Sequence, residues 1–233
     1  FYAYMSWNFS ATAIRQGVKA INADTYDLMS ETDLRRAWWD PTGSYDDLPL
    51  TSFQAGSIPY QNRKFTARAV SNAVGDVAFL RLSEMYLTAA EAAVRTGKEA
   101  EAKALLTEFM SYRRPNYDCS NLTGTALGTL TTDKTGSLLE EILLQRRIEL
   151  WGEYGRVYDI KRLRQGFVRT REMGHPVAGL LNNRDCANPE SFDWVMTIPQ
   201  KEIDANPGIV QNPIGSAPEG NTGDDPALAP NVE

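Results

Sequence analysis

Apolar residues recur every three or four positions after residue 78. Two adjacent stripes hold most of them: Phe79, Leu82, Tyr86, Ala89 and Ala93, then Leu80, Ser83, Leu87, Ala90 and Val94. Adjacent stripes of this spacing form one broad face of a helix. The pattern predicts a helix that begins near residue 80, buries a wide face and ends at Gly97, a typical residue just beyond a helix C-terminus.

A second helix is predicted between Gly97 and the stop at residues 113–115 (Arg-Arg-Pro). Its apolar positions are Ala102, Leu105, Leu106, Phe109 and Met110. Because the link at Gly97 is short, the two helices are expected to lie antiparallel. Ala90, Ala102 and Leu106 have spacings compatible with a tetratricopeptide-type hairpin, although Phe109 is bulky where that repeat usually has a small residue.

A third helix is predicted after a loop rich in Asn, Thr and Gly over residues 115–136. Ser137 and Glu140 have the spacing of a capping box, in which each side chain bonds the backbone N–H of the other residue. Gly152 and Gly155 are expected to break this helix, and a shorter helical segment follows them.

A charged residue interrupts the apolar stripe of the third helix. Arg146 falls on the same face as Leu139, Leu143 and Leu150, and a buried guanidinium needs partners. We therefore expect Arg146 and Glu149 to be buried and hydrogen-bonded. Helical spacing predicts a structural polar network of charged residues: Arg81, Glu84, Glu91, Arg146, Glu149, Glu153 and Arg156.

Composition divides the chain into three parts that are expected to form one compact domain. Residues 1–78 mix aromatic residues with turn formers, residues 79–214 carry the predicted helices, and residues 215–233 are rich in Pro, Gly, Asp and Ala. With 233 residues, 42% of them hydrophobic, the chain can bury a substantial core. It opens on aromatic residues without Met, which suggests a mature or truncated piece of something longer.

Charge and chemistry exclude several classes of function. The net charge of -6 comes from interspersed signs, so no basic surface is expected to hold a nucleic acid. The sequence contains no run of about 18 apolar residues, so no membrane-spanning helix is predicted. The single histidine, His175, has a turn-like context, and no phosphate loop, dinucleotide fingerprint or metal motif is present, so no cofactor or metal is expected. Cys119 and Cys186 could pair or remain free thiols.

Catalytic residues are not predicted. Glu149 and Glu153, one helical turn apart, could in principle form the carboxylate pair of a glycoside hydrolase. Their position among arginines at helix-pairing spacing favours a structural ion network instead.

Aromatic residues of the first 78 positions are the candidates for ligand binding, because exposed rings stack on sugars and nearby polar groups bond the hydroxyls. The candidate glycan-binding residues are Trp38, Trp39, Tyr45, Tyr60, Asn62 and Arg63. In an extended segment Trp38 and Trp39 point to opposite faces, so at most one should be buried in a single core. For each ring taken alone, ordinary packing is the alternative.

Four segments resemble one family. Residues 79–92 (FLRLSEMYLTAAEA) resemble the "LR-aE-yL-xAEA" helix of the SusD/RagB family, and residues 145–150 (QRRIEL) resemble its "ER-x-x-EL". Residues 152–162 are similar to "EG-x-RW-x-DLxR", and residues 198–213 to the closing "PIP-x-x-EI-x-x-NP-x-x-QNP". Weaker matches at residues 33–35 (DLR), similar to "DPR", and at residues 63–65 (RKF), similar to the "KF/KY" just before the first helix, extend the similarity in order over residues 33–213.

The resemblance implies a mostly α fold with tetratricopeptide-like hairpins, loop-rich excursions and minor β structure. It implies non-catalytic binding of oligosaccharide or polysaccharide at the bacterial outer surface, by an outer-membrane lipoprotein that delivers it to a SusC-like TonB-dependent transporter. The N-terminal lipid anchor of the family is expected to lie outside the given sequence, and part of the ligand platform is expected within residues 1–78. The alternative is a helical protein–protein interaction module.

Overall fold

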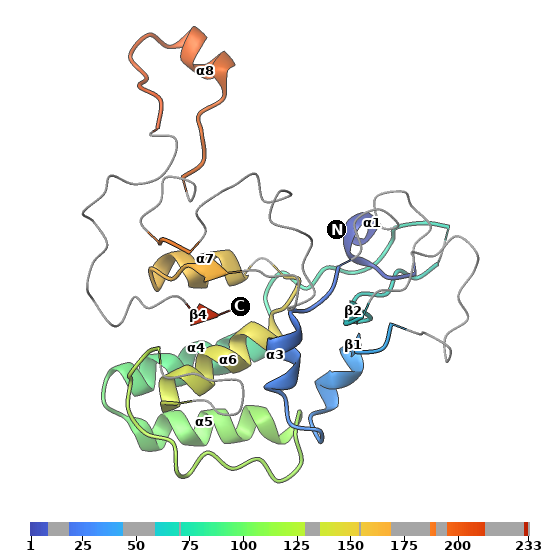
Figure 1. Cartoon of the computed structure of the whole chain (residues 1–233), viewed down its shortest axis with the longest axis vertical. Coiled ribbons are helices and arrows are strands. Elements are labelled where there is room, and N and C mark those ends of the chain that lie inside the picture. The colour runs from blue at the N-terminus through green and yellow to red at the C-terminus, as the bar shows by residue number, and fades with distance from the viewer. Residues whose placement is uncertain are drawn as a thin grey trace.

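Helices dominate the residues that the computed structural model describes, which are 1–8, 19–43, 59–69, 71–128, 136–153, 155–168, 187–189, 195–212 and 231–232. Figure 1 shows their arrangement. The helices are α1 (Tyr2–Met5), α3 (Ala23–Asp27), the 3-10 helix η1 (Leu34–Trp38), α4 (Leu82–Arg95), α5 (Glu99–Ser111), α6 (Leu138–Glu149), α7 (Gly155–Arg162) and α8 (Gln200–Ala205). The strands are β1 (Trp39–Asp40), β2 (Gln61–Asn62), β3 (Phe167–Val168) and β4 (Asn231–Val232).

The strands form two minimal sheets. β1 and β2 are antiparallel, with Trp39 opposite Asn62, and β3 and β4 are parallel, with Phe167 opposite Asn231. The prediction of a mostly helical chain with minor β structure is confirmed.

The helices α4 and α5 form the predicted antiparallel hairpin. Gly97 turns the chain with φ +77, a left-handed conformation that costs glycine little because it has no Cβ. Leu87, Ala90, Ala102 and Leu106 are all fully buried, so two small alanines let the helix axes approach while the leucines fill the interface.

Helix α6 is the centre of the molecule. The capping box of Ser137 and Glu140 at its start is present as predicted, and ten of its twelve residues are buried. Leu139 and Ile142 pack into the core made with α4 and α5. Leu144 and Ile148 pack into a second core with Ile21, Tyr26, Met29 and Trp39 from the first part of the chain. The same helix therefore carries both cores.

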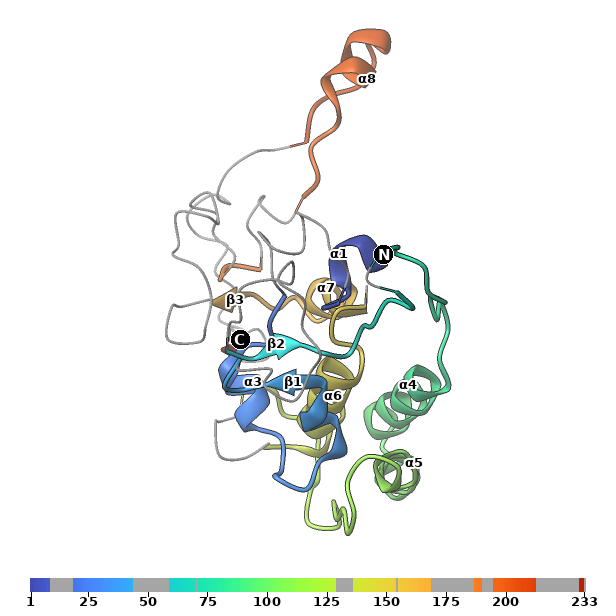
Figure 2. The same ribbon diagram turned by 90° about the vertical axis from the view of Figure 1, so that its right-hand side faces the viewer.

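The first turn of α4 departs from the prediction. The helix begins at Leu82, and Phe79, Leu80 and Leu82 are 73%, 75% and 72% exposed. Their stripes continue into buried positions only from Leu87 onward, because α6 packs on the later part of the face. In Figure 2, α4 and α5 lie at the edge of the described structure, with α6 on their inner side. The prediction of a buried face is therefore wrong for Phe79 and Leu80, which precede the helix, and for its first residue, Leu82.

Residues 195–212 form a hairpin around α8 that stands away from the rest of the described chain (Figures 1 and 2). Its base is closed by Gln211, whose side chain donates to the Ile198 carbonyl and accepts from the Ile198 N–H, both at 2.9 Å. Asn212 also donates to the carbonyl of Met196 at 2.7 Å. The segment that contains the closing family-like motif is thus held by its own polar side chains.

Candidate functional site

A cavity of about 280 Å³ lies where the first part of the chain meets α4 and the end of α6. Its lining combines aromatic rings with charged groups: Phe1, Tyr2, Trp38, Lys64, Phe65, Asp76, Val77, Ala78, Arg81, Arg113, Glu149 and Glu153. Ligand sites in proteins usually have this character, a mostly apolar wall with a few fixed polar groups. We take it as the candidate site and call it the aromatic cavity.

One wall of the aromatic cavity consists of rings held by other rings. The Phe1 and Phe65 centroids are 4.9 Å apart at an interplanar angle of 85°, and Phe65 stacks on Trp151 at 6.3 Å. Trp38 is half-buried, and its ring centroid lies 5.8 Å from that of Trp39 in an edge-to-face arrangement. Because these edge-to-face and stacked contacts fix the rings, the wall is organised before any ligand arrives.

The opposite wall is an ionic network centred on Glu149, which is fully buried at the end of α6. Its carboxylate accepts from Arg81 at 2.9 Å and from Arg113 at 2.9 and 3.0 Å, and Arg35 lies 3.6 Å away. Burial alone would raise the pKa of Glu149, but Arg113, Arg81 and Arg35 outweigh it and lower the pKa from 4.5 to about 2. Glu149 is therefore a permanent anion that ties three arginines together.

Glu153 extends the network to the rim. It accepts from Arg81 at 2.9 Å through both oxygens and from the Lys64 ammonium at 2.6 Å. The Lys64 ammonium also donates to the carbonyls of Glu149 at 2.6 Å and of Trp151 at 3.0 Å, and it lies 4.8 Å from the Trp38 ring centroid. Lys64 thus joins the aromatic wall to the ionic wall.

The Lys64 side chain is only 9% exposed, and this burial lowers its pKa from 10.5 to about 8, although Glu153 partly opposes the shift. Between pH 8 and pH 10.5 the folded state releases this proton while the unfolded state keeps it, so the wild-type free energy of unfolding gains a contribution that rises with pH.

A Lys64→Met variant should lack that gain. Denaturant unfolding at pH 8 and pH 9.5 should show the stability difference, wild type minus variant, growing by about 2 kcal/mol. Other titrating groups are common to both proteins and cancel. A difference that stays constant over this interval would contradict the lowered pKa.

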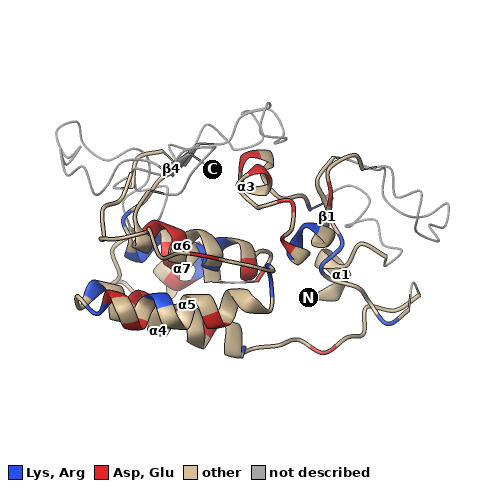
Figure 3. Cartoon of the chain, turned by 90° about the horizontal axis from the view of Figure 1, so that it is seen from below, with Lys and Arg blue, Asp and Glu red and all other residues tan. Residues whose placement is uncertain are grey.

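A second ionic network fastens α7 to α4. Arg146 is 6% exposed and bonds Asp159 at 3.2 Å and the Thr88 hydroxyl at 2.9 Å, with Glu84 at 3.7 Å. Arg162 of α7 donates to both oxygens of Glu91, at 2.6 and 2.7 Å. The expected burial of Arg146 and Glu149 is confirmed, and Figure 3 shows the mixed charges along these helices.

Arg156, another residue of the predicted network, lines a small separate cavity with Glu140, Arg147 and Gln165.

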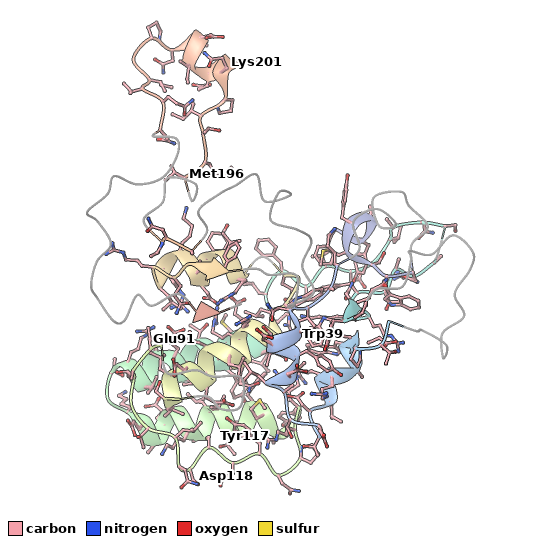
Figure 4. The ribbon with its side chains drawn as sticks, viewed as in Figure 1. Trp39, Glu91, Tyr117, Asp118, Met196 and Lys201 are labelled. Carbon is pink, nitrogen blue, oxygen red and sulfur yellow. The ribbon has the colours of Figure 1, made fainter. Side chains whose placement is uncertain are left out.

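Two of the candidate glycan-binding residues have no surface for a ligand. Trp39 is 2% exposed and packs between Trp38 and Trp151, and Figure 4 places it inside the molecule. Asn62 is 2% exposed, and its side chain donates to the Met5 carbonyl at 2.6 Å and accepts from the Phe65 N–H at 3.3 Å. Their burial corrects the sequence prediction. The Trp39 ring packs in the core, and the Asn62 side chain holds the backbone of Met5 and Phe65.

The remaining candidate glycan-binding residues differ in their position relative to the aromatic cavity. Trp38 lines the aromatic cavity. Tyr60 is half-buried against Tyr26, with ring centroids 5.3 Å apart, and Arg63 pairs with Asp40 at 2.7 Å; neither belongs to the described lining. Tyr45 lies outside the described residues, as does His175.

Of the twelve lining residues, the sequence prediction of ligand contacts included only Trp38; Lys64, Phe65, Phe1 and Arg113 are among those that it missed. A signal for two of them existed, since residues 63–65 (Arg-Lys-Phe) match the "KF" that precedes the first family-like helix.

Other kinds of site find no support in the described part of the chain. No group of three or more His, Cys, Asp or Glu residues there could hold a metal ion, and no helix there has the length and apolar character needed to cross a membrane. Cys119 is a buried free cysteine, whereas Cys186 falls outside the described ranges.

Comparison with known proteins gives the family. A crystal structure of a SusD superfamily protein from Bacteroides thetaiotaomicron aligns with a TM-score of 0.53 and 27% identity, over 79% of this chain and 38% of that one. A proposed sugar-binding protein from Bacteroides vulgatus aligns with a TM-score of 0.49 and 31% identity, over 66% of this chain and 32% of that one. The chain thus spans well under half the length of either structure.

No protein with a curated description matches the chain. The family model described as the SusD family matches residues 19–214, most of the sequence. The chain therefore belongs to the SusD family.

Proposed function

We propose that this protein is a non-catalytic carbohydrate-binding protein of the bacterial outer surface. It would hold oligosaccharide or polysaccharide and deliver it to a SusC-like TonB-dependent transporter, with attachment to the outer membrane through an N-terminal lipid. Membership of the SusD family supports each part of this proposal. The observation that carries the binding function is the aromatic cavity with Trp38 in its wall.

Sugar recognition suits the chemistry of this cavity. A pyranose has a C–H face that packs on an aromatic ring, and a rim of hydroxyls that bond polar groups. Trp38 offers a half-buried ring and Phe65 the 9% of its surface that packing leaves exposed, and Asp76 and Ala78 line the same cavity. A ring wall fixed by its own contacts loses little side-chain entropy when a ligand binds.

The Trp38→Ala variant tests the proposal. A panel of soluble plant, host and microbial oligosaccharides, followed by calorimetry on the best binder, should show affinity lowered by about tenfold or more, because stacking on an aromatic ring and its burial contribute roughly 1.5–3 kcal/mol. Tyr158→Ala is a suitable control, since Tyr158 is an exposed aromatic residue on α7 and is not part of the described cavity lining. Unchanged affinity in a folded Trp38→Ala variant would exclude this cavity as the binding site.

A second candidate function is a helical module that binds a polypeptide. The exposed apolar residues around the start of α4 favour it: Phe79, Leu80, Leu82 and Met85 lie next to each other in sequence and are between 48% and 75% exposed. In that case the panel would return no glycan, whereas a Leu82→Ser variant would weaken capture of the transporter in a pull-down.

A further inference from the structure

The charged groups of the aromatic cavity are already committed to one another. Lys64 has three N–H donors, and three acceptors take them: the carbonyls of Glu149 and Trp151 and the carboxylate of Glu153. Arg81 donates through Nε, Nη1 and Nη2 to Glu149 and Glu153, at 2.8 to 2.9 Å. These two cations have no strong donor left for a ligand.

Arg113 completes the same closed set. Its Nε and Nη2 donate to the Glu149 carboxylate at 3.0 and 2.9 Å. Both oxygens of Glu149 are thus shared between guanidinium groups, and the side chain has no exposed surface. Each charged group of the ionic wall thus has a counter-ion within it. Only Nη1 of Arg113, which donates to the Tyr112 carbonyl at 3.4 Å, bonds no carboxylate.

The formal charges of the lining side chains are balanced as well. Lys64, Arg81 and Arg113 are the cations, and Asp76, Glu149 and Glu153 are the anions. Asp76 is 94% exposed at the side chain and pairs with Arg68 at 2.7 Å on the outside. An anionic ligand would either displace a carboxylate from its arginine or stand beside the carboxylates without compensation, and like charges held close in a partly dry site repel strongly.

We propose that the aromatic cavity selects a neutral sugar unit and discriminates against sugars that carry a carboxylate or a sulfate. This inference rests on the proposed glycan-binding function and adds the class of ligand. The aromatic rings supply attraction for an uncharged C–H face, while the saturated ionic wall supplies the discrimination. A volume of about 280 Å³ is near the lower end of ligand pockets, so one or two sugar units enter and the rest of a longer glycan stays outside.

The test compares two forms of one ligand by calorimetry: the best neutral binder from the panel and its derivative oxidised at C6 to the uronate. Reduction of the carboxylate regenerates the neutral ligand and controls for damage during the oxidation. We expect the uronate to bind at least about tenfold more weakly, and the reduced form to regain the neutral affinity. A uronate that binds as well as the neutral form, or a panel led by acidic glycans, overturns the inference while leaving glycan binding intact. A panel without any binder overturns the proposed function and this inference with it.

The Glu153→Gln variant shows whether charge causes the discrimination. Glu153 lies at the rim with its side chain 16% exposed, and its neutralisation leaves the lining with one cation more than its anions. The ratio of uronate to neutral affinity should rise at least about threefold. Glu108→Gln, which makes the same chemical change outside the described lining, should leave the ratio as in the wild type. An unchanged ratio in a folded Glu153→Gln variant would refute the ionic explanation.

Discussion

Replacement of Glu149 by Gln is expected to lower the free energy of unfolding by about 3–5 kcal/mol, because it removes the central anion from a cluster of guanidinium groups. Arg35 keeps Asp33 and Arg81 keeps Glu153, but Arg113 loses its carboxylate partner. Arg35 has a side chain only 1% exposed, and Arg81 and Arg113 are 22% and 26% exposed, so water can replace the lost carboxylate only in part. Urea unfolding at pH 7, followed by circular dichroism, measures the loss.

The matched control is Glu101→Gln. Glu101 lies on α5 with its side chain 56% exposed and pairs with Lys98 at 3.5 Å, a surface pair worth less than about 1 kcal/mol. If the two variants lose the same stability, the network around Glu149 contributes nothing beyond a surface pair.

The loss of stability in acid should also depend on Glu149. The folded pKa of Glu149 is about 2, against an ordinary value of 4.5. Its contribution is therefore fully present above pH 4.5 and is lost as the pH falls from 4.5 towards 2, by about 3 kcal/mol over the whole interval. The Gln variant cannot titrate at this position, so its stability should fall less steeply over that range than that of the wild type.

The second large effect is expected at Gly152, in the turn between α6 and α7. Its φ is +74, and a Cβ there would lie 2.5 Å from Phe65 Cε2 and 2.8 Å from Met5 Cε. Gly152→Ala should therefore combine the cost of a left-handed backbone with the displacement of a ring that lines the aromatic cavity. We expect a loss of about 3 kcal/mol in unfolding free energy.

Gly97→Ala separates these two causes. Gly97 has nearly the same backbone angle, φ +77, but beyond its chain neighbours no heavy atom lies within 4 Å of the position that a methyl group would take there. It should lose only about 1 kcal/mol, the conformational cost alone. Equal losses in the two variants would mean that Phe65 and Met5 move aside freely.

The helices could be predicted from the sequence because their signals are local. The apolar period, the capping box at Ser137 and the glycines at 97 and 152 each act within a few residues. The burial of Arg146 followed from the same period, since the leucines on its face fix which side of α6 it occupies. Its partners on α4 and α7 close a network that the spacing alone could only suggest.

The candidate site was harder to predict because it depends on contacts between distant residues. Alternation indicated that at most one of Trp38 and Trp39 is buried, and the packing of Trp151 against Trp39 shows which one. A single lysine in a loop normally indicates a solvated residue. Lys64 is an exception because its acceptors at Glu149, Trp151 and Glu153 come from more than 80 positions further along the chain.

The central position of α6 has a consequence for any attempt to divide this chain. Ile21, Tyr26 and Trp39 find their apolar partners on Leu144 and Ile148, and Arg35, which pairs with Asp33 at 2.7 Å, also lies 3.6 Å from Glu149. A cut near residue 78 would remove the apolar surface of α6 from the aromatic-rich fragment. It would leave the other fragment with Leu144 and Ile148 uncovered and without Arg35 and Lys64 beside its carboxylates, although Glu149 keeps Arg81 and Arg113. The two pieces are therefore suited to complementation with each other, as halves of one folding unit, more than to separate expression.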